Sequence, residues 1–112
     1  MNKIEEFINI NNLLDCYQNL LTDKQKNIMQ KYYKFDLSLM EISNELNISR
    51  SAVLDTIEKA KNKLMIYEEK LGFYKKSLQI SNILKENNVK EEIIEEIEEV
   101  LENGIWGINW EI

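Results

Sequence analysis

The sequence predicts an all-α protein with about five helices, and three observations predict this class. The 112-residue chain contains no proline and only three glycines, and these residues are the main helix breakers and the usual source of tight β-turns. Apolar residues recur at helical spacing along most of the chain, and several segments begin with residues that cap helices. A single domain over residues 1–112 is expected, because ~100–200 residues is the usual domain length.

Apolar side chains near the start of the chain form a stripe at helical spacing. The stripe predicts a helix over residues 4–21 with this face in the core. Asn11 and Asn12 interrupt it, so a helix that begins near these two residues is an alternative. The residues of the stripe are Ile4, Phe7, Ile8, Leu14, Tyr17 and Leu21.

Two sequences of capping-box form introduce the next two helices. In each, a hydroxyl residue is followed three positions later by Gln or Glu, as in Thr22 with Gln25 and Ser38 with Glu41. The first predicts a helix from about Asp23 to Tyr33, and the second a short helix that ends near Leu46. The side chains expected to be buried in the first are Ile28, Met29, Tyr32 and Tyr33.

Residues 39–57 have the pattern of a helix-turn-helix. Asn47 falls at the turn, where the backbone needs a left-handed conformation that Asn tolerates better than most residues. Ser43 is small where the two helices cross closely, and Ile48 is expected to pack between them. Ser49 can cap the second helix and leave its first turn facing a DNA major groove. An ordinary helical corner is the competing interpretation.

The fourth helix, which begins after Ser49, has the clearest periodicity. Its apolar residues alternate at spacings of four and three, the a/d heptad of a helix packed along its whole length. The phase continues across Gly72, so one long helix through this glycine is expected at a cost of about 1 kcal/mol; a helix end at Gly72 is the alternative. The stripe is expected to serve the core and a homodimer contact, or the core alone. Its residues are Val53, Ile57, Ala60, Leu64, Tyr67, Leu71, Tyr74 and Leu78.

The C-terminal part of the chain carries the excess acid. Residues 66–112 contain five Lys and eleven Glu, and residues 66–103 are expected to form a helical extension for packing or dimerisation. Its last helix is expected from about Lys90 to Asn103, with Glu on the outer faces. The side chains expected to be buried are Val89, Ile93, Ile97, Val100 and Leu101.

The apolar tail, residues 104–112, alternates large apolar and other residues. Trp106, Ile108, Trp110 and Ile112 share one face of an extended segment. We expect this face to dock on the protein's own helices or on a second copy. Binding to another partner is the alternative, because Trp is favoured at interface hot spots.

Missing residue types limit the chemistry. Without His, imidazole-based nucleophilic catalysis and histidine metal sites are excluded. One cysteine, Cys16, forms neither an internal disulfide nor a Cys-cluster zinc site, and it is expected to be a small buried side chain. The paired glutamates are better explained by a solvated face than by a metal site. We therefore expect no enzymatic activity, no metal and no cofactor.

Location follows from the same residue counts. No run approaches the ~18 apolar residues of a membrane span, and the first six residues lack the apolar core of a signal peptide. A single thiol suits a reducing compartment. The expected location is the cytoplasm.

The start of the fourth helix supplies the candidate DNA contacts. Arg50 can hold a guanine edge or a phosphate, and serine hydroxyls at a helix N-terminus can donate to phosphates. Asp55 and Glu58 on the same face oppose this, and pairing of Arg50 with Glu45 or Asp55 is the alternative. The candidate contacts are Ser49, Arg50, Ser51, Leu54, Asp55 and Lys59, flanked by Lys24, Lys26, Lys61 and Lys63.

The net charge of the chain does not exclude DNA binding. The whole chain has a net charge of −6, whereas nonspecific DNA binders are usually basic because phosphate contacts supply most of their affinity. The helix-turn-helix portion, residues 22–65, has eight basic and six acidic side chains.

Several segments, taken in order, resemble the YlxM-type helix-turn-helix proteins, small bacterial proteins similar to region 4 of sigma factors. The resemblance implies a cytoplasmic all-α protein with a sigma-like DNA-binding domain and a role in the signal recognition particle pathway. It departs from the family at Ser51, where Gln is frequent, and at Leu54, where Tyr is frequent. The tail from Gly104 lies outside it. The matching segments are residues 20–26, 32–33, 36–42, 48–57 and 67–71.

Two functions therefore compete. The first is a DNA-binding regulator. The second is an accessory factor that binds the GTPase, the RNA or the receptor of the signal recognition particle without reading DNA. The acidic C-terminal helix suits a basic partner surface, because complementary charge speeds encounter and selects partners.

Overall fold

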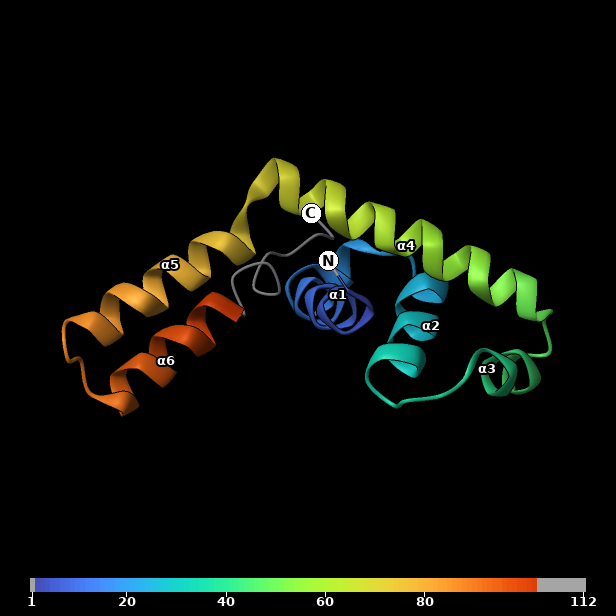
Figure 1. The fold of residues 1–112 in the computed structure, drawn as a ribbon, viewed down its shortest axis with the longest axis horizontal. Coiled ribbons are helices and arrows are strands. Elements are labelled where there is room, and N and C mark those ends of the chain that lie inside the picture. The colour runs from blue at the N-terminus through green and yellow to red at the C-terminus, as the bar shows by residue number, and fades with distance from the viewer. Residues whose placement is uncertain (1, 103–112) are drawn as a thin grey trace, which may run out of the picture.

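The computed structural model describes residues 2–102, and helices account for nearly all of them (Figure 1). No strand occurs among these residues, so the predicted all-α class is confirmed. The tail, residues 104–112, lies outside the described residues. The elements are α1 (Lys3–Tyr17), the 3-10 helix η1 (Gln18–Leu20), α2 (Asp23–Tyr33), α3 (Leu39–Leu46), α4 (Arg50–Leu71), α5 (Phe73–Glu86) and α6 (Glu91–Glu102).

The core is built on α4. Helices α1, α2 and α3 all pack against it, and Figure 1 shows them on one side of its long ribbon. We call this part, residues 2–71, the body. Each buried Val, Leu, Ile or Met in it contributes about 1.5–3 kcal/mol. The buried side chains are Ile10, Leu13, Leu14, Tyr17, Leu21, Ile28, Met29, Tyr33, Ile42, Val53, Ile57, Ala60 and Leu64.

Side chains cap the helices of the body where the sequence predicts. The hydroxyl of Thr22 accepts from the backbone N–H of Gln25, whose side chain accepts in return. Ser38 and Glu41 form the same reciprocal pair. Ser49 begins α4 by accepting from the backbone N–H of the residue three positions on, 3.0 Å away. Both capping boxes and the cap at Ser49 are thus confirmed.

The first helix buries the later residues of the predicted stripe, Leu14 and Tyr17, but not its first residues. Ile4 and Ile8 are 72% and 54% exposed, whereas the buried residues of α1 are Ile10, Leu13, Leu14 and Tyr17. The helix runs unbroken through Asn11, whose side-chain amide donates to the backbone carbonyl of Tyr33, 3.1 Å away. The polar Asn11 side chain is therefore accommodated within α1, because a carbonyl at the end of α2 accepts its hydrogen bond.

Gly72 ends α4, and the expectation of one continuous helix is wrong. Its φ of 61° and ψ of 24° are left-handed, a conformation that glycine adopts without the Cβ penalty. The chain turns there, and α5 runs in a new direction (Figure 1). Leu71 and Leu78, on either side of the break, are 49% and 47% exposed. Tight core packing in the heptad stripe ends at Leu64.

One carboxylate organises the chain at this break. The two oxygens of Glu68 accept from the backbone N–H groups of Tyr74 and Lys75, at 3.0 and 3.1 Å, and so cap α5 from the preceding helix. The buried phenol of Tyr17 donates to Glu68 Oε1 over 2.6 Å and accepts from the backbone N–H of Phe73 over 3.0 Å. These bonds join α1, α4 and α5.

Helices α5 and α6 form a hairpin beside the body (Figure 1). They contact each other, and α5 also contacts α1. In α6 the buried side chain is Ile94, while Ile93 and Val100 are 45% and 67% exposed. The predicted burial is therefore wrong for Ile93 and Val100, whereas Ile97 and Leu101 are half-buried. Residues of α5 are at most half-buried, so the hairpin is a satellite of the core.

Candidate nucleic-acid interface

Helices α3 and α4 are joined by a tight left-handed turn. Asn47 has φ 55° and ψ 46°, as predicted for this position. The backbone N–H groups of Asn47 and Ile48 both donate to the carbonyl oxygen of Ser43, which satisfies the end of α3. Ser43 is buried, and Ile48 is half-buried. The predicted corner geometry is confirmed: α3 ends, the chain reverses, and α4 begins at its cap, Ser49.

The opposite sides of α4 differ sharply in exposure. Val53, Thr56 and Ile57 face the core. All six candidate DNA contacts are exposed: Ser49, Arg50, Ser51, Leu54, Asp55 and Lys59. The structure therefore brings these residues together on one outward surface, which we call the reading face.

Ion pairs compensate the acids near the reading face. Asp55 pairs with Lys59 one turn on, at 3.0 Å, and Glu45 pairs with Lys31 of α2. Among residues 2–102, no acidic side chain forms an ion pair with Arg50, so the alternative in which Glu45 or Asp55 binds Arg50 is wrong. Exposed pairs stabilise a fold by only ~0–1 kcal/mol, but they lower the local negative charge that opposes phosphate. Sequence reasoning missed Lys31, because only the packing of α2 beside α3 reveals its partner.

The flanking lysines are less available than the sequence suggests. Lys61 binds Glu6 and also lies 3.6 Å from Glu58. The hydrogen bond between Lys61 and Glu6 raises the pKa of Lys61 and lowers the pKa of Glu6. Lys63 donates to the side-chain oxygen of Gln25. Lys26 and Lys63 are both half-buried and Lys24 is exposed. Lys26, Lys61 and Lys63 thus make contacts inside the body, Lys26 through Asn19, which leaves Arg50 as the main cation of the reading face.

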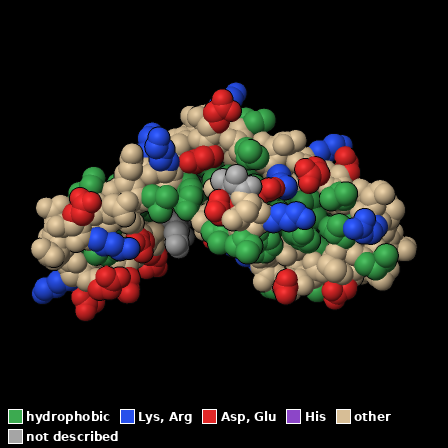
Figure 2. Space-filling model, in the orientation of Figure 1, with side chains coloured by type: hydrophobic (Ala, Val, Ile, Leu, Met, Phe, Trp, Pro, Cys, Tyr) green, Lys and Arg blue, Asp and Glu red, His purple; other side chains and the backbone are tan. Residues whose placement is uncertain are grey.

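Charge is distributed unevenly over the surface. Figure 2 shows acidic side chains gathered over the outer edge of the hairpin, where α6 lies, and both signs of charge mixed over the body. No residue of α6 forms an ion pair with a Lys or Arg among residues 2–102. The described residues contain no group of three or more His, Cys, Asp and Glu placed to hold a metal ion. None of the described helices is long and apolar enough to cross a membrane.

Two crossing helices, a left-handed turn and an exposed, capped second helix define a helix-turn-helix protein. Residues 4–103 match the family described as "Putative helix-turn-helix protein, YlxM / p13 like", and the chain belongs to this family, UPF0122. The family predicted from the sequence segments is thereby confirmed.

Relatives from several bacteria are similar over most of the chain. The UPF0122 protein of Fusobacterium nucleatum is 40% identical over 102 residues, which cover 89% of this chain and 96% of the relative. One from a Thermoanaerobacter species is 41% identical over 106 residues, covering 86% and 91%. One from Malacoplasma penetrans is 45% identical over 92 residues, covering 79% and 86%. The family match, residues 4–103, spans both the body and the hairpin.

Proposed function

We propose that the chain is a DNA-binding regulatory protein in which the start of α4 enters a major groove, as in the sigma-factor region that its sequence resembles. The observation that carries this proposal is the exposed N-terminus of α4, with Arg50 unpaired by any described acid. A helix N-terminus favours phosphate, because its first N–H groups have no partner within the helix.

Each residue of the reading face has a role in this proposal. Arg50 reaches a guanine edge or a phosphate. Ser49 accepts a hydrogen bond as the cap of α4 and keeps its own hydroxyl proton for a phosphate oxygen. Leu54, 41% exposed, suits a thymine methyl group. Asp55 accepts from a cytosine amino group once Lys59 moves to a phosphate. With so few cations, we expect affinity to be modest and steeply dependent on salt.

Fluorescence anisotropy with a pool of short random-sequence DNA duplexes tests the proposal. Binding is expected at low salt, to fall as salt rises, and to be lost in Arg50→Ala. Lys85→Ala is the matched control, because it removes one exposed positive charge from the hairpin instead. The proposal is wrong if no duplex binds at low salt, or if both substitutions weaken binding equally.

A second function is favoured by the acidic face of α6. Its exposed glutamates lack described cationic partners, so the face suits a basic protein surface and repels nucleic acid. We propose it as the contact for the GTPase or receptor of the signal recognition particle, the pathway that the family resemblance implies. The exposed residues are Glu91, Glu92, Glu95, Glu96 and Glu99.

Binding assays with purified GTPase, receptor and RNA separate the two functions. Glu95→Lys combined with Glu96→Lys is expected to abolish binding to the protein component, whereas Arg50→Ala leaves it intact. The reverse pattern supports action through the reading face. Absence of binding to every component excludes the accessory function.

A further inference from the structure

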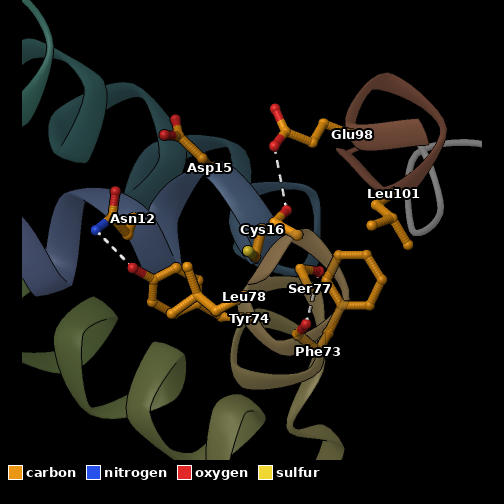
Figure 3. Close-up of a pocket in the computed structure, with 10 residues that line it drawn as sticks. Asn12, Asp15, Cys16, Phe73, Tyr74, Ser77, Leu78, Glu98 and Leu101 are labelled. Atoms are coloured by element: carbon orange, nitrogen blue, oxygen red, sulfur yellow. Dashed lines mark hydrogen bonds between the residues drawn. The ribbon is translucent and has the colours of Figure 1, made fainter. Parts of the chain in front are cut away.

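Helices α5 and α6 pack against each other through one side of each helix. The hydroxyl of Ser81 in α5 donates to Glu98 of α6 over 3.1 Å, which is the dashed line at Glu98 in Figure 3, beside the pocket between α1 and the hairpin. Ile94 of α6 is buried, and Leu84 of α5 and Leu101 of α6 are half-buried. These residues mark the packing side of the hairpin.

Each of these residues directly follows an aliphatic residue. A helix turns by about 100° per residue, so the aliphatic side chains lie beside the packing side, and in an antiparallel pair they fall on the same side of the hairpin. Ile83 lies about two and a half turns after Tyr74, whose hydroxyl accepts from Asn12 of α1, so this side points away from α1. We call it the outer face; Ile97 is half-buried in it and the others are exposed. Its residues are Ile80, Ile83, Ile93, Ile97 and Val100.

A row of glutamates borders the outer face. Glu92, Glu96 and Glu99 directly precede the outer-face residues of α6 and are exposed, along the edge of the hairpin where Figure 2 shows acidic side chains. No Lys or Arg among residues 2–102 forms an ion pair with them. The corresponding positions of α5, Gln79 and Asn82, are neutral. The outer face is therefore apolar at its centre and negative along one edge, and exposed apolar patches with polar rims mark interaction sites.

We propose that the outer face binds an amphipathic helix of a partner protein, whose apolar stripe is bordered by Lys or Arg. The stripe packs on the aliphatic residues, as amphipathic helices do in apolar grooves, and the cations meet the glutamates, so charge selects the partner. With 12 residues, α6 is about 18 Å long, so about three turns of the partner helix cover the face. The proposal rests on the acidic contact of the second proposed function and specifies the form of its partner.

Other occupants lack the complementary charge. A second copy would set against the glutamates either the same glutamates or Gln79, Asn82 and Lys76, which hold a single cation. Residues 104–112 contain no Lys or Arg. The glutamates repel the phosphates of nucleic acids and of anionic lipids.

Fluorescence anisotropy with a labelled peptide tests the proposal on the full chain. The probe is a peptide of about 14 residues, nearly four helical turns, made of Leu and Lys with Leu on one face of the helix. A control peptide of the same composition has Leu and Lys in alternation, which gives no apolar stripe on a helix. The amphipathic peptide is expected to bind saturably and at least about tenfold more tightly than the control. Equal binding of the two peptides would overturn the proposal.

A single substitution tests the apolar part of the face. Ile93→Ser is expected to weaken binding of the amphipathic peptide about tenfold, because an aliphatic side chain that binding would bury is lost. Ile66→Ser is the matched control, because it removes from α4 an aliphatic side chain of similar exposure, 48% against 45%, and it is expected to leave binding unchanged. Circular dichroism verifies that both variants remain helical. Equal losses in the two variants would count against the outer face as the site.

Two pairs of substitutions test the charged edge. Glu92→Gln with Glu96→Gln is expected to weaken binding about tenfold at low salt and less as salt rises, because salt screens the attraction. Glu91→Gln with Glu95→Gln removes the same charge from nearly the opposite side of α6, since each lies two positions from Ile93. This second pair is expected to weaken binding less than about twofold. Equal effects of the two pairs would show that the partner does not meet this edge and would overturn the proposal.

Binding of purified GTPase and receptor separates the helix-binding role from the second proposed function. Peptide binding as described, with no binding of either protein, excludes that function and leaves the helix-binding role in place. A protein that binds the wild-type chain and Ile93→Ser equally, but not Glu95→Lys with Glu96→Lys, supports the function and overturns the helix-binding role.

Two further results would assign the outer face to another occupant and overturn the proposal. Self-association that Ile93→Ser weakens, measured by sedimentation velocity, assigns the face to a second copy. Tryptophan emission that shifts in Ile93→Ser without any peptide assigns it to residues 104–112, which hold both tryptophans of the chain.

Discussion

Asn47 fixes the corner between α3 and α4 through a single left-handed backbone conformation. This residue is predictable from the sequence, because the chemistry that selects Asn for a left-handed turn is local to the residue. The same holds for the caps at Thr22, Ser38 and Ser49, each of which binds a backbone N–H three positions away. Contacts between residues close in the sequence can therefore be predicted without knowing the rest of the fold.

Replacement of Asn47 tests the cost of this turn. Asn47→Ala is expected to lower the free energy of unfolding by about 1–2 kcal/mol, because a Cβ disfavours the left-handed region. Asn47→Gly is expected to be neutral or slightly stabilising. Urea denaturation measures both, with Asn44→Ala on the exposed side of α3 as the control. Equal effects of Ala and Gly would show that the left-handed turn does not limit stability.

Two buried tyrosines make the fold sensitive to alkali. Burial, reinforced by the hydrogen bond to Glu68, raises the pKa of Tyr17 above its ordinary value of 10.0. Burial also raises the pKa of Tyr33. The unfolded chain therefore loses these protons at lower pH than the folded chain does. Their stabilising effect is complete below pH ~10 and is lost as the pH rises further.

Urea denaturation at a series of pH values measures this loss. Above pH ~10 the free energy of unfolding is expected to fall by up to ~1.4 kcal/mol per pH unit for each tyrosine that stays protonated in the fold. Tyr33→Phe is expected to make the alkaline slope shallower. A flat profile in the wild-type chain above pH 10 would contradict the burial of these phenols.

At the scale of the element, the buried face of a helix is less predictable from the sequence than its N-terminal cap. The faces expected to be buried in the first and last helices are only partly correct, because burial depends on where the neighbouring helices lie. In α6, Ile94 is buried and Ile93 is exposed, although both have the same chemistry. The heptad phase continues across Gly72, so the sequence favours a continuous helix over the break that occurs there. Tyr74 falls at a heptad position beyond the break, but it packs beside α1, where its hydroxyl accepts from the side chain of Asn12.

The sign of one substitution distinguishes a helix end from a continuous helix. In a continuous helix, Gly72→Ala would stabilise the chain by about 1 kcal/mol. At a left-handed helix end it is expected to destabilise by about 1–2 kcal/mol. A new Cβ would meet its nearest neighbours at 4.0 Å, so backbone strain alone determines the result. Urea denaturation reports the sign, and a gain in stability would contradict the observed break.

At the scale of the molecule, the heptad stripe divides into two parts. Val53, Ile57 and Leu64 are buried in the body, while Leu71 and Leu78 are about half exposed. We propose the exposed part as the contact of a homodimer. The sequence reveals the periodicity, but the change from core to surface arises from the turn at Gly72.

The same substitution at two positions of the stripe separates these roles. Leu64→Lys is expected to destabilise the fold by about 3 kcal/mol or more, because the charge is buried without a partner. Leu71→Lys is expected to leave thermal unfolding nearly unchanged and to weaken self-association. Sedimentation velocity at several concentrations measures the latter. A wild-type chain that stays monomeric at high concentration would contradict the dimer.

The position of the core along the chain has a consequence for synthesis on the ribosome. The buried residues of the core cluster all lie between Ile10 and Leu64, so the body holds its buried packing partners before the hairpin emerges, and Phe73 and Tyr74 of α5 add partly buried contacts afterwards. Chains generally fold from the N-terminus as they emerge. The nascent body can therefore fold first, with Tyr17 and Glu68 already paired. When Phe73, Tyr74 and Lys75 emerge, their backbone N–H groups can donate at once to the Tyr17 hydroxyl and the Glu68 carboxylate. The first turn of α5 therefore forms on acceptors that the body already holds in position.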